Sequence, residues 1–242
     1  MEHLDLSEPP SPVLVVVAHP DDIDFGTAGT VSRLTDAGAE VVYALVTSGE
    51  AGPPDDETDR ARVAAERQAE QHAAGAQVGV TDIRWLGHPD GHLTASLELR
   101  RDISRVIRQV RPQLVIAQNP ERRWDRIYAS HPDHLAVAEA TMAAVYPDAR
   151  NRWAHVELYD DEGLDPHAVP EVWIGMLDPT DVFIDITDVF DRKVAALRSH
   201  ASQTGWIDDL DALLRPWAAG VTTAAGLPEG RLTEAFRRID TA

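Results

Sequence analysis

Residues 13 to 26 read VLVVVAHPDDIDFG, an apolar run that ends abruptly in a cluster of acids. The five residues Val13 to Val17 predict a strand buried on both faces, as strands of parallel sheets are. In an open parallel α/β sheet, ligands bind in the crevice outside the carboxyl ends of the strands. The residues after this strand should therefore lie at a functional edge, and they include His19, Asp21, Asp22 and Asp24.

The rest of the chain fits the same α/β class. Short β-branched runs alternate with amphipathic stretches, which predicts a Rossmann-like, mostly parallel sheet flanked by helices, with a smaller C-terminal portion of strands and helices. We see no linker-like composition, so we expect a single domain over residues 1–242. The expected strands are 13–17, 41–47, 82–86, 113–117, 154–159, 172–177 and 182–186. The expected helices are 29–37, 60–74, 97–110, 133–145, 189–200, 210–219 and a short one at 234–239.

Length and charge limit the kind of protein. The 242 residues are enough to bury a substantial core, and 43% of them are hydrophobic, an ordinary globular proportion. The 41 Asp and Glu residues outnumber the 22 Lys and Arg residues, and the net charge of -19 repels nucleic acid and anionic membrane surfaces. We therefore expect neither of these as a partner.

Cysteine is absent from the chain. Disulfides, thiolate nucleophiles and cysteine zinc sites are excluded, so any metal must be held by histidine and carboxylate. The acidic stretch at residues 1–12 lacks the apolar segment of a signal peptide, and the apolar runs are too short to span a bilayer. We expect a cytoplasmic protein.

His-Pro-Asp occurs three times, and the first copy has the spacing of metal ligands. His19 and Asp22 are three residues apart with a proline between them, so a tight turn can present both to one ion. Neutral imidazole and carboxylate suit zinc or a similar divalent ion, and Asp21 between them could act as a base. The competing interpretation is that these aspartates only cap the following helix.

The other two copies differ from each other. The stretch HPDH at residues 131–134 opens an expected helix, and one of its histidines would complete a zinc site with three protein ligands and an open position. The middle copy, GHPDGH at residues 87–92, has a strong turn signature. Only Asp90 keeps a functional expectation there, because it follows a strand.

Together these motifs resemble the PIG-L/LmbE-like family of metal-dependent de-N-acetylases, which act mostly on substrates containing N-acetylglucosamine. The resemblance runs across nearly the whole chain and is specific only in combination. Arg67 and Glu70 supply an R-x-x-E pattern within it. The matching stretches are AHPDD (18–22), ERQAEQHAAGAQVGV (66–80), PDG (89–91), HPDH (131–134) and FIDITDVFDRKVAALRSHASQ (183–203).

The resemblance implies a role for each matching residue. It implies that zinc is bound by His19, Asp22 and His134, and that Asp21 is the general base. It further implies that His131 steadies the oxyanion and then helps to protonate the leaving amine, with Asp133 orienting its ring. Arg67 and Asp90 match positions that look like contacts to sugar hydroxyls.

Three further residues stay open at this level. Tyr128 stands shortly before the HPDH motif, where some relatives have a tyrosine that contributes to the oxyanion site. His200 and Gln203 belong to the HASQ stretch, and either they reach the substrate or they pack the C-terminal helix. We favour packing.

The sequence therefore predicts a zinc-dependent hydrolase that removes an acetyl group from a small molecule containing N-acetylglucosamine. Alternatives that keep the same site are a metal-dependent hydratase or lyase acting on an unsaturated organic acid, and an amidase of a thiol-glucosaminide conjugate. A phosphatase of the haloacid-dehalogenase type, suggested by DID at residues 22–24, leaves the HPDH motif unexplained. A binding domain with a vestigial site is disfavoured by the intact set of residues. The acyl sugar, the native metal and a homo-oligomeric state remain open.

Overall fold

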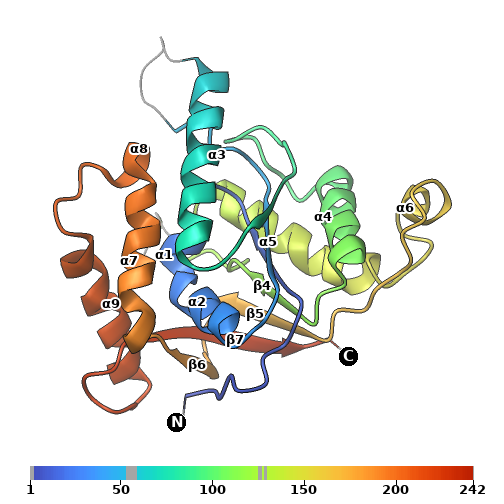
Figure 1. Ribbon diagram of the computed structural model, residues 1–242. Coiled ribbons are helices and arrows are strands. Elements are labelled where there is room, and N and C mark those ends of the chain that lie inside the picture. The colour runs from blue at the N-terminus through green and yellow to red at the C-terminus, as the bar shows by residue number, and fades with distance from the viewer. Residues whose placement is uncertain (1–2, 53–58, 125–126, 128–129, 242) are drawn as a thin grey trace.

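A computed structural model describes residues 3–52, 59–124, 127 and 130–241. Seven strands of this described part form one sheet in the order β3-β2-β1-β4-β5-β7-β6 (Figure 1). Within the same residues, no helix combines the length and the apolar character needed to cross a membrane. The strands are β1 (Val13–Val17), β2 (Val41–Leu45), β3 (Asp82–Trp85), β4 (Leu114–Ala117), β5 (Glu171–Gly175), β6 (Val182–Asp185) and β7 (Thr233–Asp240).

Strand direction puts the site at one edge of the sheet. β1 to β5 run parallel to one another, and only β7 pairs antiparallel, with β5 on one side and β6 on the other. The expected α/β fold with a mostly parallel sheet is thereby confirmed. Because β1 and β4 are neighbours, the segments that follow their carboxyl ends meet at the same edge.

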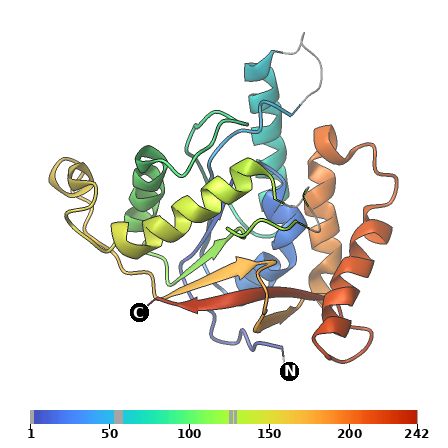
Figure 2. The same ribbon diagram turned by 180° about the vertical axis from the view of Figure 1, so that it is seen from behind.

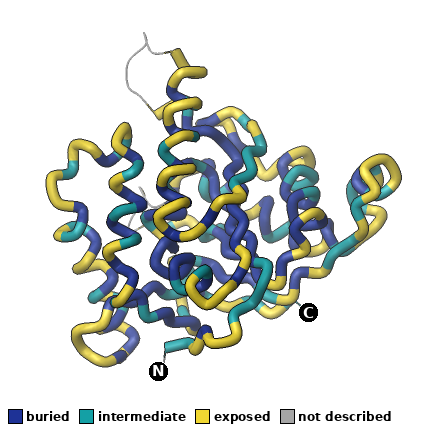
Figure 3. Tube along the Cα trace, in the orientation of Figure 1, coloured by how far each residue is buried: buried dark blue, intermediate teal, exposed yellow. Residues whose placement is uncertain are grey.

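Helices cover both faces of the sheet (Figures 1 and 2). Along β1, Val13, Val15 and Val17 join the apolar cluster under α2, α7 and α9, whereas Leu14 and Val16 join the cluster under α4 and α5. Figure 3 shows the central strands as buried. The helices are α1 (Asp22–Gly26), α2 (Ala28–Asp36), α3 (Arg60–Gln77), α4 (Leu97–Val110), α5 (Pro132–Ala143), α6 (Val156–Asp160), α7 (Phe190–Ser199), α8 (Ala201–Thr204) and α9 (Leu210–Ala224).

Local signals set the ends of the long helices. The Ser96 side chain accepts from the Leu99 N–H at the start of α4, and Asp59 accepts from the Ala61 N–H at the start of α3. α2 is followed by Gly38 with φ 91°, the left-handed conformation that favours glycine after a helix.

Two expected elements are wrong. Residues 154–159 were expected as a strand, but residues Val156–Asp160 form the helix α6. The buried Arg108 donates to the carbonyls of Asn151 and Ala154, so this segment is folded onto α4, away from the sheet. The expected helix at 234–239 is the strand β7, which has two neighbours in the sheet. Pairing on both sides outweighs the helical preference of such a short segment.

Candidate active site

The turn between β1 and α1 contains a strained residue. Asp21 has φ 82° and ψ −25°, in the left-handed region that residues other than glycine seldom adopt. Its backbone N–H donates to Gln71 Oε1 of α3 at 3.0 Å. Gln118, directly after β4, accepts from the Ala18 N–H at 3.0 Å and donates from Nε2 to Asp22 Oδ2 at 3.1 Å. Side chains from α3 and from the end of β4 therefore fix the turn.

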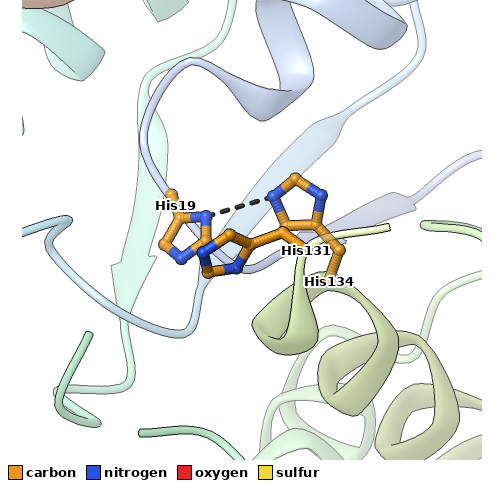
Figure 4. A group of neighbouring side chains, drawn as sticks. All are labelled: His19, His131 and His134. Carbon is orange, nitrogen blue, oxygen red and sulfur yellow. Dashed lines mark hydrogen bonds between the residues drawn. The ribbon is translucent and has the colours of Figure 1, made fainter. Parts of the chain in front are cut away.

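Three imidazoles face one another at this edge (Figure 4). His19 follows β1, whereas His131 and His134 lie at the start of α5. The centroid of the His19 ring is 5.1 Å from that of His131 and 5.1 Å from that of His134. The Asp22 carboxylate joins the group, with Oδ1 3.0 Å from His134 Nε2 and Oδ2 3.5 Å from His19 Nδ1. The sheet thus brings the first and third His-Pro-Asp motifs together.

The donor atoms of this group fit a divalent cation. His19 Nδ1 and His134 Nε2 lie 3.2 Å apart. In a tetrahedral zinc site with zinc–ligand distances of about 2.0–2.1 Å, two donor atoms are roughly 3.4 Å apart, so the observed spacing is suitable. His131 is near enough that all three histidines offer nitrogens within 4.8 Å of one another. Two neutral imidazoles with the Asp22 carboxylate are therefore a suitable ligand set in both chemistry and spacing.

The electrostatics of the group favour a positive charge beside Asp22. Burial lowers the pKa of His19, but hydrogen bonds to the Asp22 and Asp90 carboxylates outweigh burial and raise this pKa to about 10. Burial raises the pKa of Asp22, but the His134 and His19 rings outweigh it and hold that pKa well below its ordinary value. The same field that stabilises a proton on the His19 ring would stabilise a metal ion.

The far nitrogen of His19 faces two carboxylates. Nε2 lies 3.0 Å from Asp90 Oδ1 and 3.3 Å from Asp133 Oδ2. Such partners keep the ring proton on Nε2 and leave Nδ1 free for a metal. Burial raises the pKa of Asp90, but His19 and the Ala51 N–H lower it to about 2, so the carboxylate is ionised. The Gly91 N–H donates to Asp133 Oδ2 at 2.8 Å and fixes the second carboxylate.

His131 presents a proton donor beside the same group. Its Nδ1 accepts from the Asp133 N–H at 3.2 Å at the start of α5. The neutral ring then carries its proton on Nε2. Burial and the charges of His19 and His134 lower the pKa of His131, which favours this neutral form near pH 7. The backbone N–H of Asp133 thus contacts the His131 ring, whereas the Asp133 carboxylate lies beside His19 Nε2 and accepts a hydrogen bond from the Gly91 N–H.

The Asp21 carboxylate lies between the ligand group and α3. Arg67 Nη2 donates to Asp21 Oδ2 at 3.3 Å and to the Pro20 carbonyl at 2.9 Å, while Nη1 donates to the Gly49 carbonyl at 2.8 Å. Burial and the charge of Asp22 raise the pKa of Asp21 to about 7, although Arg67 opposes the shift. Asp21 is thus a carboxylate with the raised proton affinity that a general base needs.

A profile of the GlcNAc-PI de-N-acetylase family, PIG-L, matches residues 14–145. The match covers more than half of the chain and contains every residue of the group just described. The chain belongs to the PIG-L family. The resemblance inferred from the motifs is confirmed, and the PIG-L match begins inside β1, the strand from which the site starts.

Curated relatives of this PIG-L chain include two deacetylases. Diacetylchitobiose deacetylase of Thermococcus kodakarensis is 33% identical over 228 residues, which cover 94% of this chain and 82% of that protein. A probable N-acetyl-alpha-D-glucosaminyl L-malate deacetylase of Bacillus anthracis is 32% identical, with 87% of this chain and 88% of that protein covered.

Solved structures agree with the PIG-L assignment. N,N'-diacetylchitobiose deacetylase from Pyrococcus horikoshii, in complex with an inhibitor, aligns with a TM-score of 0.86 at 29% identity over 97% of this chain and 85% of that one. The hydratase GalB from Pseudomonas putida aligns with a TM-score of 0.75 over 94% of this chain and 95% of that one. At 20% identity, the second match shows the fold alone.

All eight site residues expected from the sequence lie at this edge, but three have contacts other than those expected. Asp133 was expected to orient the His131 ring, yet its carboxylate contacts His19 Nε2 and the Gly91 N–H, and only its backbone N–H contacts His131. Arg67 and Asp90 were expected to reach sugar hydroxyls, yet both are buried and bonded to protein groups. Glu70 of the same R-x-x-E pattern accepts from Ser202 of α8. Tyr128 lies outside the described residues.

Two residues of the site were missed in the sequence. Gln118 follows β4, so the rule that placed a site after β1 also pointed to this position. Gln71 gave no such signal, because a glutamine in the middle of a helix is common on solvated faces. Only the packing of α3 against the β1–α1 turn shows that Gln71 faces inward.

Proposed function

We propose that this PIG-L family member is a zinc-dependent hydrolase that removes the acetyl group from a small molecule containing N-acetylglucosamine. The observation that carries the proposal is the meeting of three suitable ligand atoms with a carboxylate base and an imidazole donor. We further propose that residues 1–242 act as one domain and that the protein works in the cytoplasm.

The residues that would bind zinc are His19, Asp22 and His134. When bound, zinc would polarise the amide carbonyl and lower the pKa of a water molecule at the open position. The Asp90 and Asp133 carboxylates support this set from the side opposite the metal position, because they face His19 Nε2.

Asp21 and His131 have separate roles in the reaction. The Asp21 carboxylate accepts the proton of the attacking water, and Arg67 keeps that carboxylate in place through its contact with Oδ2. The neutral His131 ring donates a hydrogen bond from Nε2 to the developing oxyanion and keeps this proton, because losing it would leave an imidazolate. An amide has a poor leaving group, so its nitrogen must be protonated before the C–N bond breaks, and the proton that Asp21 took from the water passes to it.

The choice of substrate class rests on the relatives. One is a diacetylchitobiose deacetylase and another a probable deacetylase of an N-acetylglucosaminyl malate, so both names specify an acetylated glucosamine. The share of both chains that is covered is high, which supports transfer of the reaction class. Which conjugate of N-acetylglucosamine this protein takes is left to the experiment.

The test is a substrate panel with the zinc-loaded protein. The protein is incubated separately with N-acetylglucosamine, diacetylchitobiose and N-acetylglucosaminyl malate, and free primary amine and acetate are measured. Hydrolysis of the amide should release the two products in equal amounts. Protein treated with a chelator and then dialysed is the control, and zinc should restore its activity. No amine from any of them, together with hydration of an unsaturated dicarboxylic acid, would replace the proposal with the hydratase alternative.

A further inference from the structure

The HASQ stretch at residues 200–203 has no role in the chemistry above. His200 lies between α7 and α8 and is completely buried. Its Nε2 is 2.8 Å from Asp24 Oδ2, and Asp24 is also completely buried. A buried imidazole and a buried carboxylate from distant parts of the chain therefore form a pair behind α1.

This pair is connected to the active-site turn. Asp24 Oδ2 accepts a second hydrogen bond, at 3.0 Å, from Gln71 Nε2. Gln71 Oε1 in turn accepts the backbone N–H of Asp21 at 3.0 Å. His200, Asp24 and Gln71 thus form a continuous chain of hydrogen bonds that ends on the backbone of Asp21.

The hydrogen-bonding partners fix the orientation of the Gln71 side-chain amide. The Asp24 carboxylate accepts hydrogen bonds, so it selects the NH₂ end of the Gln71 amide and turns the carbonyl end toward Asp21. With the amide flipped, the NH₂ group would face the Asp21 N–H and the Gln71 oxygen would face the carboxylate. His200 supplies the second donor to the same oxygen and thereby fixes where Asp24 Oδ2 lies.

Asp21, on which this series of hydrogen bonds ends, has a strained backbone conformation. Asp21 is in the left-handed region at φ 82°, where a side chain with a Cβ atom is strained. Its N–H precedes the first turn of α1 and has no carbonyl of that helix as a partner. Gln71 Oε1 supplies the acceptor, so losing it would favour relaxation of Asp21 to another conformation.

A second contact fastens the HASQ stretch to the same turn of α3. Glu70 accepts from the Ser202 N–H at 2.7 Å and from the Ser202 hydroxyl at 2.6 Å. Glu70 and Gln71 are neighbours in sequence, and α3, α7 and α8 lie side by side (Figure 1). The α7–α8 junction is therefore fixed relative to α3 at the level of the active site.

We propose that His200, Asp24 and Gln71 are positioning residues that hold Asp21 in the orientation its role as general base requires. The proposal rests on the proposed function for the role of Asp21, and on the hydrogen-bond chain for the positioning. A purely structural role for His200 would instead lower stability without a selective effect on Asp21.

The first experiment compares matched variants of His200 in the full-length, zinc-loaded protein. His200→Leu removes the donor, His200→Gln restores an N–H near the position of Nε2, and Thr204→Val is the control. Thr204 is buried in the same segment, and its hydroxyl donates to the Leu197 and His200 carbonyls. Removing this hydroxyl therefore perturbs the packing there but leaves the hydrogen bonds among His200, Asp24 and Gln71 intact. We measure kcat, KM, zinc per chain and Tm.

We expect His200→Leu to lower kcat at least about tenfold with KM and zinc content unchanged, because a small misplacement of a reacting group is costly. His200→Gln should recover most of kcat, and Thr204→Val should leave kcat unchanged at a similar loss of Tm. An equal fall of kcat in Thr204→Val, or no recovery in His200→Gln, would overturn the proposal.

The second experiment does not depend on activity. Hydrogen exchange of the Asp21 amide, followed by NMR, should be faster in Gln71→Leu and His200→Leu relative to amides of the β1 core. Unchanged relative protection in both variants would overturn the positioning role. If the native protein deacetylates no substrate, the proposed function fails, and this exchange measurement still decides whether the chain positions Asp21.

Discussion

The turns after β1 and β3 carry the same tripeptide and have different roles. His19 of the first turn has Nδ1 3.2 Å from His134 Nε2, facing the ligand group. His88 of the second turn has Nε2 3.0 Å from Asp102 Oδ2 of α4, away from that group. The second turn reaches the site through Asp90 and the Gly91 N–H, which fix the carboxylates behind His19. The two copies have the same sequence, so their surroundings decide whether a copy provides a metal-binding side chain or holds one in place.

The largest effect should come from removing a ligand. His134→Ala should lose zinc and lower kcat/KM by at least about a thousandfold, because the metal supplies both the water and the carbonyl polarisation. The matched variant in the supporting turn, His88→Ala, should keep zinc and most of the activity and lose about 1 kcal/mol of stability with its hydrogen bond. Metal analysis, amine release and thermal unfolding check both variants. Unchanged zinc in His134→Ala would break the contrast between the two turns.

The second prediction separates the base from the ligands within the first turn. Asp21→Asn should lower kcat by about 10²- to 10⁴-fold, since the proton acceptor is lost, with zinc near one equivalent per chain. Zinc content and single-turnover amine release are measured on the same sample. Loss of zinc in this variant would move Asp21 into the ligand set.

The third prediction concerns the support that the second turn gives. Asp90→Asn keeps the shape but weakens the acceptor for His19 Nε2, and zinc affinity should fall about 10- to 100-fold. Competition with a zinc indicator measures this affinity. If affinity stays constant while KM for the substrate rises, Asp90 contacts the sugar, as the motif resemblance implies.

The smallest effect should be a shift in pH dependence. Arg67 lowers the pKa of Asp21, whereas burial and Asp22 raise it to about 7. A divalent ion on Asp22 would lower it further. Since the base works unprotonated, activity is lost as the pH falls through this pKa. Arg67→Gln raises the pKa, so the acidic limb of kcat/KM should move about one unit to higher pH.

The control for this shift is Arg84→Gln, which removes an arginine on the outer part of the sheet that pairs with Asp82. Its profile of kcat/KM against pH should match that of the native protein. An acidic limb that moves equally in both variants would show a general effect of charge, and one that moves in neither would show that Arg67 does not act on the base.

Individual residues show where sequence reasoning succeeded. The run Val13 to Val17 predicted a strand buried on both faces, with the cluster after it at the carboxyl edge of the sheet, and the structure confirms the buried strand. The ligand candidates followed from the residue types, because histidine and carboxylate were the only strong ligands in a chain without cysteine.

Reasoning from sequence failed where long-range packing decides the outcome. The segment Thr233–Asp240 is a strand because β5 and β6 offer it hydrogen-bonding edges on both sides. Val156–Asp160 is a helix because Arg108 of α4 ties the preceding loop away from the sheet. Neither neighbour can be read from the segment itself.

The class of fold, the edge at which the site lies and the residue types that could bind a metal follow from the amino-acid sequence, because periodicity and side-chain chemistry are local properties. Three arrangements depend on how the chain packs. Asp90 and Asp133 face Nε2 of His19, and Arg67 donates to protein carbonyls. His200 is connected to the backbone of Asp21 through Asp24 and Gln71. These contacts join residues far apart in the chain, and hydrogen bonds of about 3 Å depend on how α3, α5 and α7 pack on the sheet.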